Sequence, residues 1–400
     1  MVNSGLRMRD RIVPVRSMRT ALVLGIALML PARLLAQIPP RELPDSLPST
    51  NARPISDSLP PLVGIVDPQV RQASGCCAMP PVNGAASFGC SANGGACVPG
   101  QTGCTPGDDH SVFGRLLNGF YGQICCPDPC YEPRWIPAAN AAFFQDSPRP
   151  VTQTRVRWDA GFDYRFPDTA EYFWGKIGTK APKNPTPSVR YGDLRFYQEI
   201  ATKGASAFTE MSYRSIDSGT NPSAAGLGDI NVGVKTVMLD RELILVTSQM
   251  TTYIPAGSFT SGLGTGHVAL EPSLLTALKL TPSTFLQTQL AYWIPLGGTP
   301  GFAGSTFHYH ASLNQNLYTH GEYVNVVGTM EVNGYSFRGQ FTDFPSGVAT
   351  PLSGRGYVNL GPGLRIQFCE RLDIGVGMAF GVTREHGPAQ LYRSELRLRY

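Results

Sequence analysis

The sequence predicts an all-β protein: a single up-and-down antiparallel transmembrane β-barrel of about 12 strands over residues 154–400, preceded by a disulfide-rich loop segment. Three observations support this prediction. Long segments alternate apolar and polar residues, short and long connections alternate between these segments, and the chain ends on an aromatic residue. A soluble β-sandwich has no reason to combine all three features.

The clearest alternating segment is RVRWDAGFDYRF, residues 155–166. Its odd-numbered residues are polar or glycine, whereas its even-numbered residues are apolar and include Trp158 and Phe162. Successive side chains of a strand point to opposite faces, so this strand has one charged and one apolar face. The alternation is longer than the roughly five or six residues of a strand in a globular protein. It matches the about 9–11 residues of a tilted membrane-spanning strand.

Eleven further segments show the same alternation, each over eleven to fifteen residues. One register is filled by aliphatic and aromatic side chains, and the other by charged, amide or small ones. In residues 372–382 the second register contains a row of small residues, Gly375, Gly377, Ala379 and Gly381. The eleven segments are 190–202, 204–216, 228–239, 242–254, 266–280, 284–294, 305–317, 321–333, 355–368, 372–382 and 389–400.

The apolar register of each strand is expected to face lipid, and the polar register is expected to face the lumen. The predicted lumen carries charges of both signs, which indicates either a solute path of mixed selectivity or a salt-bridged filling. The residues predicted to line it are Arg155, Arg157, Asp159, Asp163, Arg165, Arg195, Glu199, Glu210, Arg214, Asp229, Lys235, Glu271, Lys279, His308, His310, Glu331, Arg365, Asp373, Arg393, Glu395 and Arg397.

The connections between the twelve segments alternate without exception between short and long. The short turns are KG, DR, TPS, THG and ER. The others are rich in Gly, Pro, Ser and Thr, and the longest are residues 167–189 and 335–354. Outer-membrane barrels have short periplasmic turns at one end and long extracellular loops at the other. The alternation therefore predicts an up-and-down barrel.

Aromatic residues gather near the predicted strand ends, as in the interfacial girdles of membrane barrels. We expect the girdle at the long-loop end to contain Tyr164, Phe166, Tyr213, Tyr253, Tyr292 and Trp293. We expect the girdle at the short-turn end to contain Phe285, Tyr318, Tyr323, Phe368 and Tyr400.

The C-terminal strand resembles the signal by which outer-membrane barrels are recognised for assembly. Its apolar residues continue to the end of the chain: Tyr392, Leu396, Leu398 and Tyr400. The alternative is an ordinary last strand, because 10% of all residues are aromatic and an aromatic last residue can therefore occur by chance. Together with the eleven earlier segments, this strand predicts two partners, the barrel-assembly machinery and outer-membrane lipid.

Residues 1–36 have the features of a secretory signal peptide. An arginine-rich start is followed by the apolar run ALVLGIALML and by a cleavage point after Ala36. The alternative is an uncleaved anchor, although this run is shorter than the about 20 residues of a spanning helix. Removing residues 1–36 lowers the formal charge from +4 to −1. The mature chain therefore has no basic excess, and we exclude nucleic acid as a partner.

Residues 37–75, rich in Pro and Ser, are predicted to be an extended linker, and residues 136–153 a second linker. Between them, residues 76–135 form a Cys-rich segment. An even number of cysteines in an exported, loop-rich segment predicts disulfides, whose pairing the sequence leaves open. A metal site is the alternative, but C-x2-C pairs do not recur. The disulfide candidates are Cys76, Cys77, Cys90, Cys97, Cys104, Cys125, Cys126 and Cys130, whereas Cys369 is expected to be a packing residue.

Three motifs in the barrel region resemble one family. They are GLGDINVGVKTVML (226–239), TTYIPAGSFTSGLGTG (251–266) and QLAYWIPLGG (289–298). They resemble the outer-membrane barrel family of phenol meta-cleavage-pathway (MetA-pathway) transporters. The resemblance implies a barrel that carries small aromatic or hydrophobic solutes. The chain has IPAG where the family more often has Thr between Pro and Gly, and its Cys-rich segment instead resembles leaders of exported planctomycete-like proteins.

The strand number limits what the lumen can do. About eight strands are filled by side chains, and about sixteen leave an aqueous channel. Twelve strands should leave a narrow passage, or one closed by inward side chains or by the N-terminal segment. We therefore expect a channel or transporter for small-molecule solutes that uses no cofactor and is not an enzyme.

Two other functions are weighed against transport. The barrel could be a structural anchor for the Cys-rich segment. A lipid hydrolase is less favoured, because Ser and His lie mainly in loops or in the inward register and no GxSxG motif is present. His308 and His310 share one face, but a metal site needs a third ligand, so we interpret them as polar lumen residues. The oligomeric state is left open.

Overall fold

The computed structural model describes residue 131 and residues 133–400, except 166, 168–170, 178–179, 300–303, 322, 343–348, 352–354, 370 and 385–386. The predicted signal peptide, the first linker and the eight clustered cysteines lie outside the described residues. The elements are η1 (Ala138–Asn140), β1 (Gln153–Arg165), β2 (Ser188–Ala201), β3 (Ala205–Asp217), β4 (Ala224–Asp240), β5 (Ile244–Ile254), η2 (Phe259–Ser261), β6 (Val268–Thr281), β7 (Thr284–Leu296), β8 (Thr306–His320), β9 (Val324–Phe337), β10 (Gln340–Thr342), β11 (Ala349–Pro351), β12 (Gly356–Phe368), β13 (Leu372–Gly381) and β14 (Gln390–Arg399).

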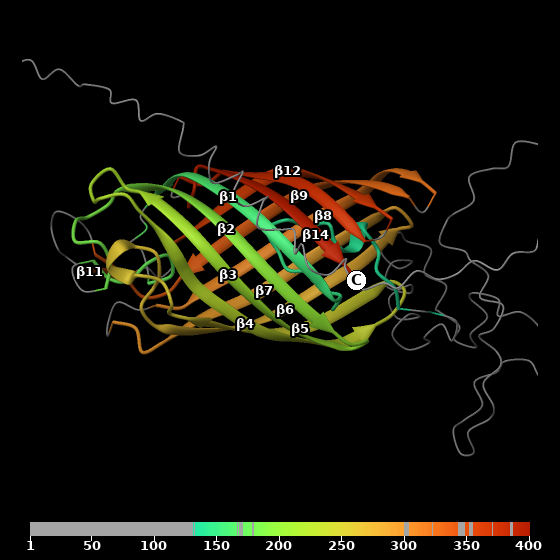
Figure 1. The fold of residues 1–400 in the computed structure, drawn as a ribbon, viewed down its shortest axis with the longest axis horizontal. Coiled ribbons are helices and arrows are strands. Elements are labelled where there is room, and N and C mark those ends of the chain that lie inside the picture. Colours follow the sequence, from blue (N-terminus) through green and yellow to red (C-terminus); the bar gives the residue numbers. More distant parts are fainter. Residues whose placement is uncertain are drawn as a thin grey trace, which may run out of the picture. The chain divides into compact units, whose positions relative to one another are not determined.

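The predicted fold class is confirmed: twelve antiparallel strands form one closed barrel (Figure 1). Each barrel strand pairs with the next barrel strand along the chain, and β14 closes the barrel against β1, with Gln153 opposite Arg399 and Phe162 opposite Gln390. Closure leaves no strand edge unpaired, which is what a bilayer core requires. β10 and β11 pair only with each other, outside the barrel sheet, in the connection between β9 and β12.

Short and long connections alternate as predicted. The turns 202–204, 241–243, 282–283, 321–323 and 369–371 join β2–β3, β4–β5, β6–β7, β8–β9 and β12–β13. The remaining connections are longer, and the first of them covers residues 166–187. Among the described residues, no helix has both the length and the apolar character to cross a membrane.

The outer wall of the barrel is apolar. Trp158, Phe196, Leu290 and Ile374 project outward with 41%, 42%, 47% and 48% of their surface exposed. Most of the residues next to them in sequence, such as Asp159, Tyr197, Gln289 and Asp373, are buried. A closed barrel with an apolar exterior satisfies its backbone internally and exposes only apolar groups to lipid. The chain is therefore an outer-membrane barrel.

Beyond Gly161, the faces predicted for the side chains of β1 are wrong. The register against β2 shifts between Gly161 and Tyr164, and Asp163 adopts a φ of 49°. This bulge exchanges the two faces, so Tyr164 is buried, whereas Asp163 and Arg165 point out and pair at 3.1 Å. Asp163 and Arg165, predicted to line the lumen, therefore do not line it, and Tyr164 is not a girdle residue.

The predicted girdles are correct only for aromatic residues in the outward register. Tyr253, Phe285 and Trp293 point inward, where Phe285 and Trp293 are buried and the Tyr253 hydroxyl donates to Glu271 at 3.0 Å. Phe166 lies outside the described residues. The residues that do project outward are Tyr213, Tyr292, Tyr318, Tyr323, Phe368 and Tyr400. Position near a strand end does not distinguish the two faces, whereas register does.

The expectation that Cys369 is a packing residue is also wrong. It lies in the turn between β12 and β13 with a φ of 46°, and it is exposed. The turn begins immediately after Phe368, so Cys369 leaves the inward and outward alternation of the strand. It is therefore not a packing residue.

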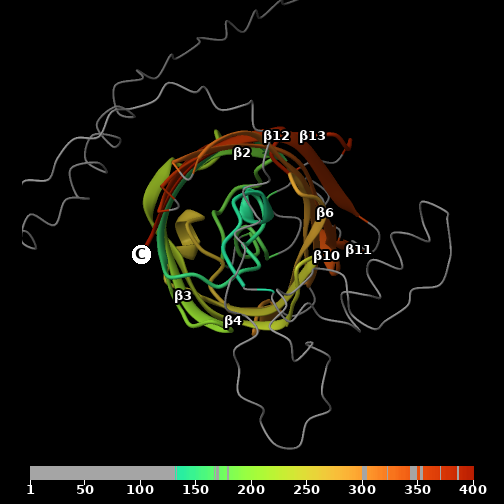
Figure 2. The same ribbon diagram turned by 90° about the vertical axis from the view of Figure 1, so that its right-hand side faces the viewer.

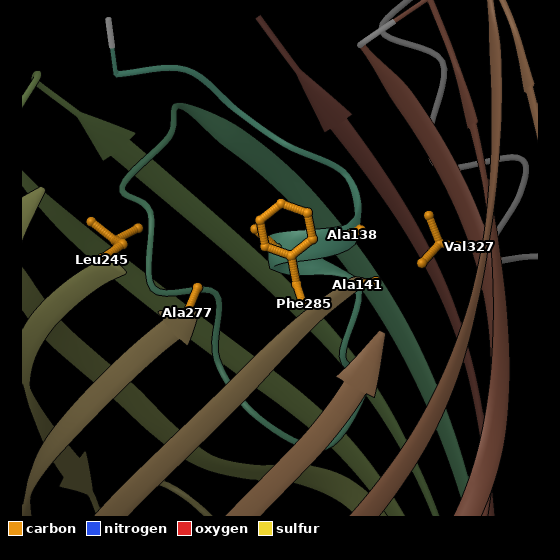
Figure 3. Packing of buried hydrophobic residues seen from close by; sticks show 7 residues of the cluster. Ala138, Ala141, Leu245, Ala277, Phe285 and Val327 are labelled. Atoms are coloured by element: carbon orange, nitrogen blue, oxygen red, sulfur yellow. The ribbon is translucent and has the colours of Figure 1, made fainter. Parts of the chain in front are cut away.

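The segment expected to be the second linker lies inside the barrel. Figure 2 shows it as the teal chain enclosed by the ring of strands. We call residues 133–152 the plug segment. Its residues Ala138, Ala139 and Ala141 form a buried cluster with wall residues Leu245, Ala277, Phe285 and Val327 (Figure 3). Irregular backbone at membrane depth is tolerated only where protein or water surrounds it, and here the barrel surrounds it.

Candidate functional site

The plug segment has almost no backbone partners of its own, so the barrel wall supplies them. The Glu331 carboxylate on β9 accepts the backbone N–H groups of Phe143 and Phe144 at 2.7 and 3.0 Å. Glu331 is 1% exposed. A buried carboxylate that receives two N–H groups has its hydrogen-bonding capacity largely satisfied, and the two N–H groups are fixed in one place.

Arginines on β12, the strand next to β9, and on β14 donate to the carbonyl groups of the same segment. Arg365 Nε donates to the Ala141 carbonyl at 3.1 Å. Arg397 donates to the carbonyls of Asn140 and Ala142 at 2.8 and 3.2 Å. The barrel wall therefore supplies an anion for the N–H groups of the plug segment and cations for its carbonyl groups.

These arginines are themselves paired. Arg365 lies 2.7 Å from Asp373 and 3.1 Å from Glu395, and Glu395 also pairs with Arg397. Arg399 also pairs with Asp373. Buried charges need such partners, because an unpaired charge in this environment would cost several kcal/mol. The network fixes the orientation of each guanidinium toward the plug segment.

Three glycines, which have no side chain, leave space for the Phe143 ring. A Cβ added at Gly363, Gly375 or Gly377 would lie 2.5, 2.6 or 2.8 Å from ring atoms of Phe143. The guanidinium of Arg365 stacks over the other side of this ring, 4.4 Å from its centroid. The row of small residues seen in the sequence of β13 therefore makes room for one side chain of the plug segment.

Neutral side chains on β5, β7 and β8 hold the rest of the plug segment. Gln289 accepts the Asp146 N–H at 2.8 Å, and Asn314 donates to the Ala138 carbonyl at 2.8 Å. Thr247 donates to the Pro148 carbonyl at 2.6 Å. Hydrogen bonds therefore hold the plug segment on several sides of the barrel.

An ion-pair clamp holds the segment at the short-turn end. Arg149 donates two hydrogen bonds to the Asp240 carboxylate, both 2.8 Å long, and the Tyr131 hydroxyl donates to Asp240 at 2.9 Å. Burial, and then the Asp240 carboxylate, raise the pKa of the Tyr131 phenol to about 12. Tyr131 therefore remains a donor at neutral pH.

Two cavities lie between the plug segment and the long loops, with volumes of about 200 and 170 Å³. We call them together the chamber. Phe144 of the plug segment lines both, and Leu263 and Thr265 of the β5–β6 loop line the first. The residues that line both cavities are Phe144, Tyr172, Arg195, Asn231, Tyr253, Tyr335 and Arg393.

One wall of the chamber is rich in arginine. Arg155, Arg157 and Arg195 approach Glu210 to 3.3, 3.5 and 2.9 Å. Arg393 chelates the carboxylate of Asp159 with two nitrogens and donates a third hydrogen bond to the Phe143 carbonyl of the plug segment. Arg393 thus connects the chamber wall to the plug segment.

The opposite wall is aromatic and contains two histidines. The Tyr335 ring lies 4.8 Å from His308 and 5.4 Å from His310, and His308 Nδ1 lies 3.5 Å from Glu271. Within the described residues, no group of three or more His, Cys, Asp or Glu side chains could hold a metal ion.

The β1–β2 loop folds over the chamber. The Glu171 carboxylate accepts the N–H groups of Lys176 at 3.0 Å and Thr299 at 2.7 Å, which ties this loop to the β7–β8 loop. Trp174 is completely buried. The Tyr172 ring packs 5.4 Å from Trp293, and burial raises the pKa of its phenol well above the ordinary value. The loop thus places a neutral hydroxyl in the chamber.

The remaining predicted lumen residues fall into three groups. Some contact the plug segment or pair with side chains that do, some line the chamber, and Lys279, Lys235 and Glu199 form ion pairs with other residues of the barrel. Lys279 pairs with Glu242 at 3.2 Å, Lys235 with Glu199 at 3.3 Å, and Asp229 accepts the Gly257 and Thr265 N–H groups. The buried members are Arg155, Arg157, Asp159, Glu199, Glu210, Lys235, Glu271, His308, His310, Glu331, Arg365, Asp373, Glu395 and Arg397.

The sequence left open that the N-terminal segment closes the passage, but it did not indicate that the residues expected to be the second linker do so, and it did not identify the loop residue Tyr172. One signal could have identified the plug segment. The run AANAAFF, residues 138–144, is too apolar for a solvated linker. No comparable signal marks Tyr172, because its position depends on how a loop folds.

Comparisons with known proteins address the fold alone. No family model matches the chain, and no curated protein matches it in sequence. Among solved structures, an outer-membrane channel from Pseudomonas putida F1 is similar with 11% identity and a TM-score of 0.44, covering 65% of this chain and 100% of that one. The NanC porin has 7% identity and a TM-score of 0.35, covering 62% and 98%. The KdgM porin has 8% identity and a TM-score of 0.32, covering 62% and 99%.

Proposed function

We propose that this protein is an outer-membrane channel for small solutes, closed at its short-turn side by the plug segment in the state described here. The observation that carries the proposal is the chamber. Cavities of about 200 and 170 Å³, lined by charged, amide and hydroxyl groups, lie inside a barrel that crosses the membrane. A barrel that only anchored another segment would have no need for polar cavities at this depth.

The way in which the plug segment is attached would allow it to leave the barrel. The segment contributes no strand to the barrel, and β1 and β14 close the barrel without it. Side chains rather than a strand ladder hold it, so it can leave while every ladder hydrogen bond of the barrel persists. Loss of the segment would join the chamber to the short-turn mouth and give a continuous path.

The proposed solutes are small and aromatic or hydrophobic. The resemblance to MetA-pathway transporters supports this class, and so do the rings of Phe144, Tyr172, Tyr253 and Tyr335 around the chamber. The outer wall would contact lipid, and the exposed residues at the end of β14, Leu398 and Tyr400, would be read by the barrel-assembly machinery.

The second candidate is a structural anchor for the Cys-rich segment. The specific observation in its favour is the number of wall side chains that bind the plug segment, because a tightly held segment would tether whatever precedes it. The lipid hydrolase has no such observation in its favour.

Planar-bilayer recording distinguishes transport from anchoring. The full chain is compared with a variant that lacks residues 37–150, so that the signal peptide and the whole of β1 remain. We expect low or intermittent conductance for the full chain and sustained conductance for the deletion variant. A folded deletion variant that conducts no ions would contradict transport and favour the anchor.

A further inference from the structure

Arg157 differs from the other arginines of the chamber wall because, among the described residues, its side chain makes no hydrogen bond. The Nε atoms of Arg155 and Arg195 are also buried without a partner, but both side chains donate to Glu210. The side chain of Arg157 is 10% exposed. Its guanidinium lies 3.5 Å from Glu210 and 3.7 Å from Asp159, longer than the about 2.7–2.9 Å of a charge-assisted hydrogen bond. Among the described residues, its Nε is buried without a hydrogen-bond partner. Buried polar groups are normally satisfied, so this one points to a missing acceptor.

The surroundings of Arg157 carry a positive excess. The strands β14, β1, β2 and β3 direct five arginines but only three carboxylates toward the chamber. The arginines are Arg155, Arg157, Arg195, Arg214 and Arg393, and the carboxylates are Asp159, Asp193 and Glu210. The excess is local to this wall, because Asp146, Asp229 and Glu271 line the other sides of the chamber, and an anion placed against the wall would balance it there.

The carboxylates on the other sides of the chamber already have partners. Asp229 accepts backbone N–H groups of the β5–β6 loop, and Glu271 accepts the Tyr253 hydroxyl. Asp146 of the plug segment accepts from Gln249 at 2.9 Å and lies 3.8 Å from Arg155. None of the three pairs with Arg157, so its guanidinium can still donate hydrogen bonds to an external carboxylate.

Aromatic rings complete the site. Phe144, Tyr172 and Tyr335 line the cavity that Arg157 lines, and the Tyr172 and Tyr335 rings are 6.2 Å apart. The cavity measures about 170 Å³. An apolar cavity of about 150 Å³ is large enough to bind benzene. By volume, the space is therefore large enough for one six-membered ring, and its mainly polar lining favours a ring with a polar substituent.

We propose that the chamber binds small aromatic carboxylates, with the carboxylate on Arg157 and the ring among Phe144, Tyr172 and Tyr335. The inference deepens the proposed function, on which it rests, by naming the class of solute that the channel selects. An aromatic ring alone would leave Arg157 without an acceptor, and a carboxylate alone would not fill the space beside the rings.

Isothermal titration calorimetry on the full chain in detergent tests this proposal. The ligands are benzoate, its neutral analogue benzamide, acetate as a carboxylate without a ring, and benzylamine as an aromatic cation. We expect saturable binding of benzoate, and binding at least tenfold weaker for each of the other three. Equal affinity for benzoate and benzamide, or tighter binding of benzylamine, would overturn the proposal.

Two variants locate the site. Arg157→Gln should weaken benzoate binding at least tenfold, and Arg165→Gln is the matched control on the same strand, because Arg165 points outward. If Arg157→Gln fails to fold, Tyr335→Leu keeps the arginine and should weaken benzoate while leaving acetate unchanged. Equal losses in Arg157→Gln and Arg165→Gln would contradict the assignment.

The calorimetric test of the solute class and the bilayer test of the channel can fail independently of each other. Calorimetry detects binding whether or not ions pass, whereas the bilayer recordings detect passage whether or not benzoate binds. Conductance without benzoate binding would overturn only the solute class. Benzoate binding without conductance in any variant would overturn the channel and leave a binding site.

Discussion

Replacing Gly377 with leucine should open the barrel. A Cβ at this position would lie 2.8 Å from Cγ of Phe143 and 3.0 Å from its Cδ2. Contacts below 3.0 Å force a shift, and leucine adds three further carbon atoms toward the same ring. The backbone of Gly377 belongs to the ladder between β12 and β14, so the ring of the plug segment has to move instead.

The expected size of the effect follows from the displaced ring. Overpacking a filled site costs about 1–3 kcal/mol. If the ring leaves, the burial of Phe143 is lost, which is worth about 1.5–3 kcal/mol. The bound state of the plug segment should therefore lose at least about 1–3 kcal/mol, which changes the ratio of bound to displaced states about 5- to 150-fold.

Single-channel recording measures this ratio as the fraction of time spent open. Gly377→Leu should raise it, and Val376→Leu is the control, because Val376 is 56% exposed on the outer face of the same strand. If folded Gly377→Leu shows the same open fraction as the wild type, either the plug segment does not close the channel or Phe143 does not hold it.

Three further predictions follow from the contacts of the plug segment and the outer wall. Glu331→Gln should raise the open fraction, because the Phe143 and Phe144 N–H groups lose a charged acceptor, and Glu242→Gln at a short turn, where the side chain is 41% exposed, should not. The pKa of Tyr131 is raised to about 12, so its contribution to the clamp is complete below its ordinary pKa near 10 and is lost as the pH rises toward 12. Ultraviolet titration should show one late phenolate fewer in Tyr131→Phe than in the wild type, because tyrosines such as Tyr172 also titrate late. Asp163→Asn should change stability by less than about 0.5 kcal/mol in urea unfolding, since the Asp163–Arg165 pair is exposed.

The barrel was predictable because its signal repeats. Each strand obeys a period of two, and a register error would move every apolar side chain to the wrong face, so twelve strands constrain one another. The bulge after Gly161 was not predictable in this way. Asp163, Tyr164 and Arg165 continue the alternation in the sequence, and only the positive φ of Asp163 exchanges their faces.

The site was only partly predictable. The charged register located the arginines and carboxylates of the lumen, because a strand fixes where its side chains point. What those charges contact depends on the plug segment and on the β1–β2 loop, which have no period. Gly375 and Gly377 were visible in the sequence, but their purpose required knowing that Phe143 lies against them.

Charges of both signs follow from holding irregular backbone inside a membrane. The plug segment has no strand partner, so its N–H groups require acceptors and its carbonyls require donors. Glu331 serves the first need, and Arg365 and Arg397 serve the second. Charged side chains of one sign could satisfy only one of these needs. The mixed charge at the short-turn side therefore helps to bind the plug segment, and in the proposed channel selection among solutes would come from the chamber, where the wall around Arg157 carries more positive than negative charge.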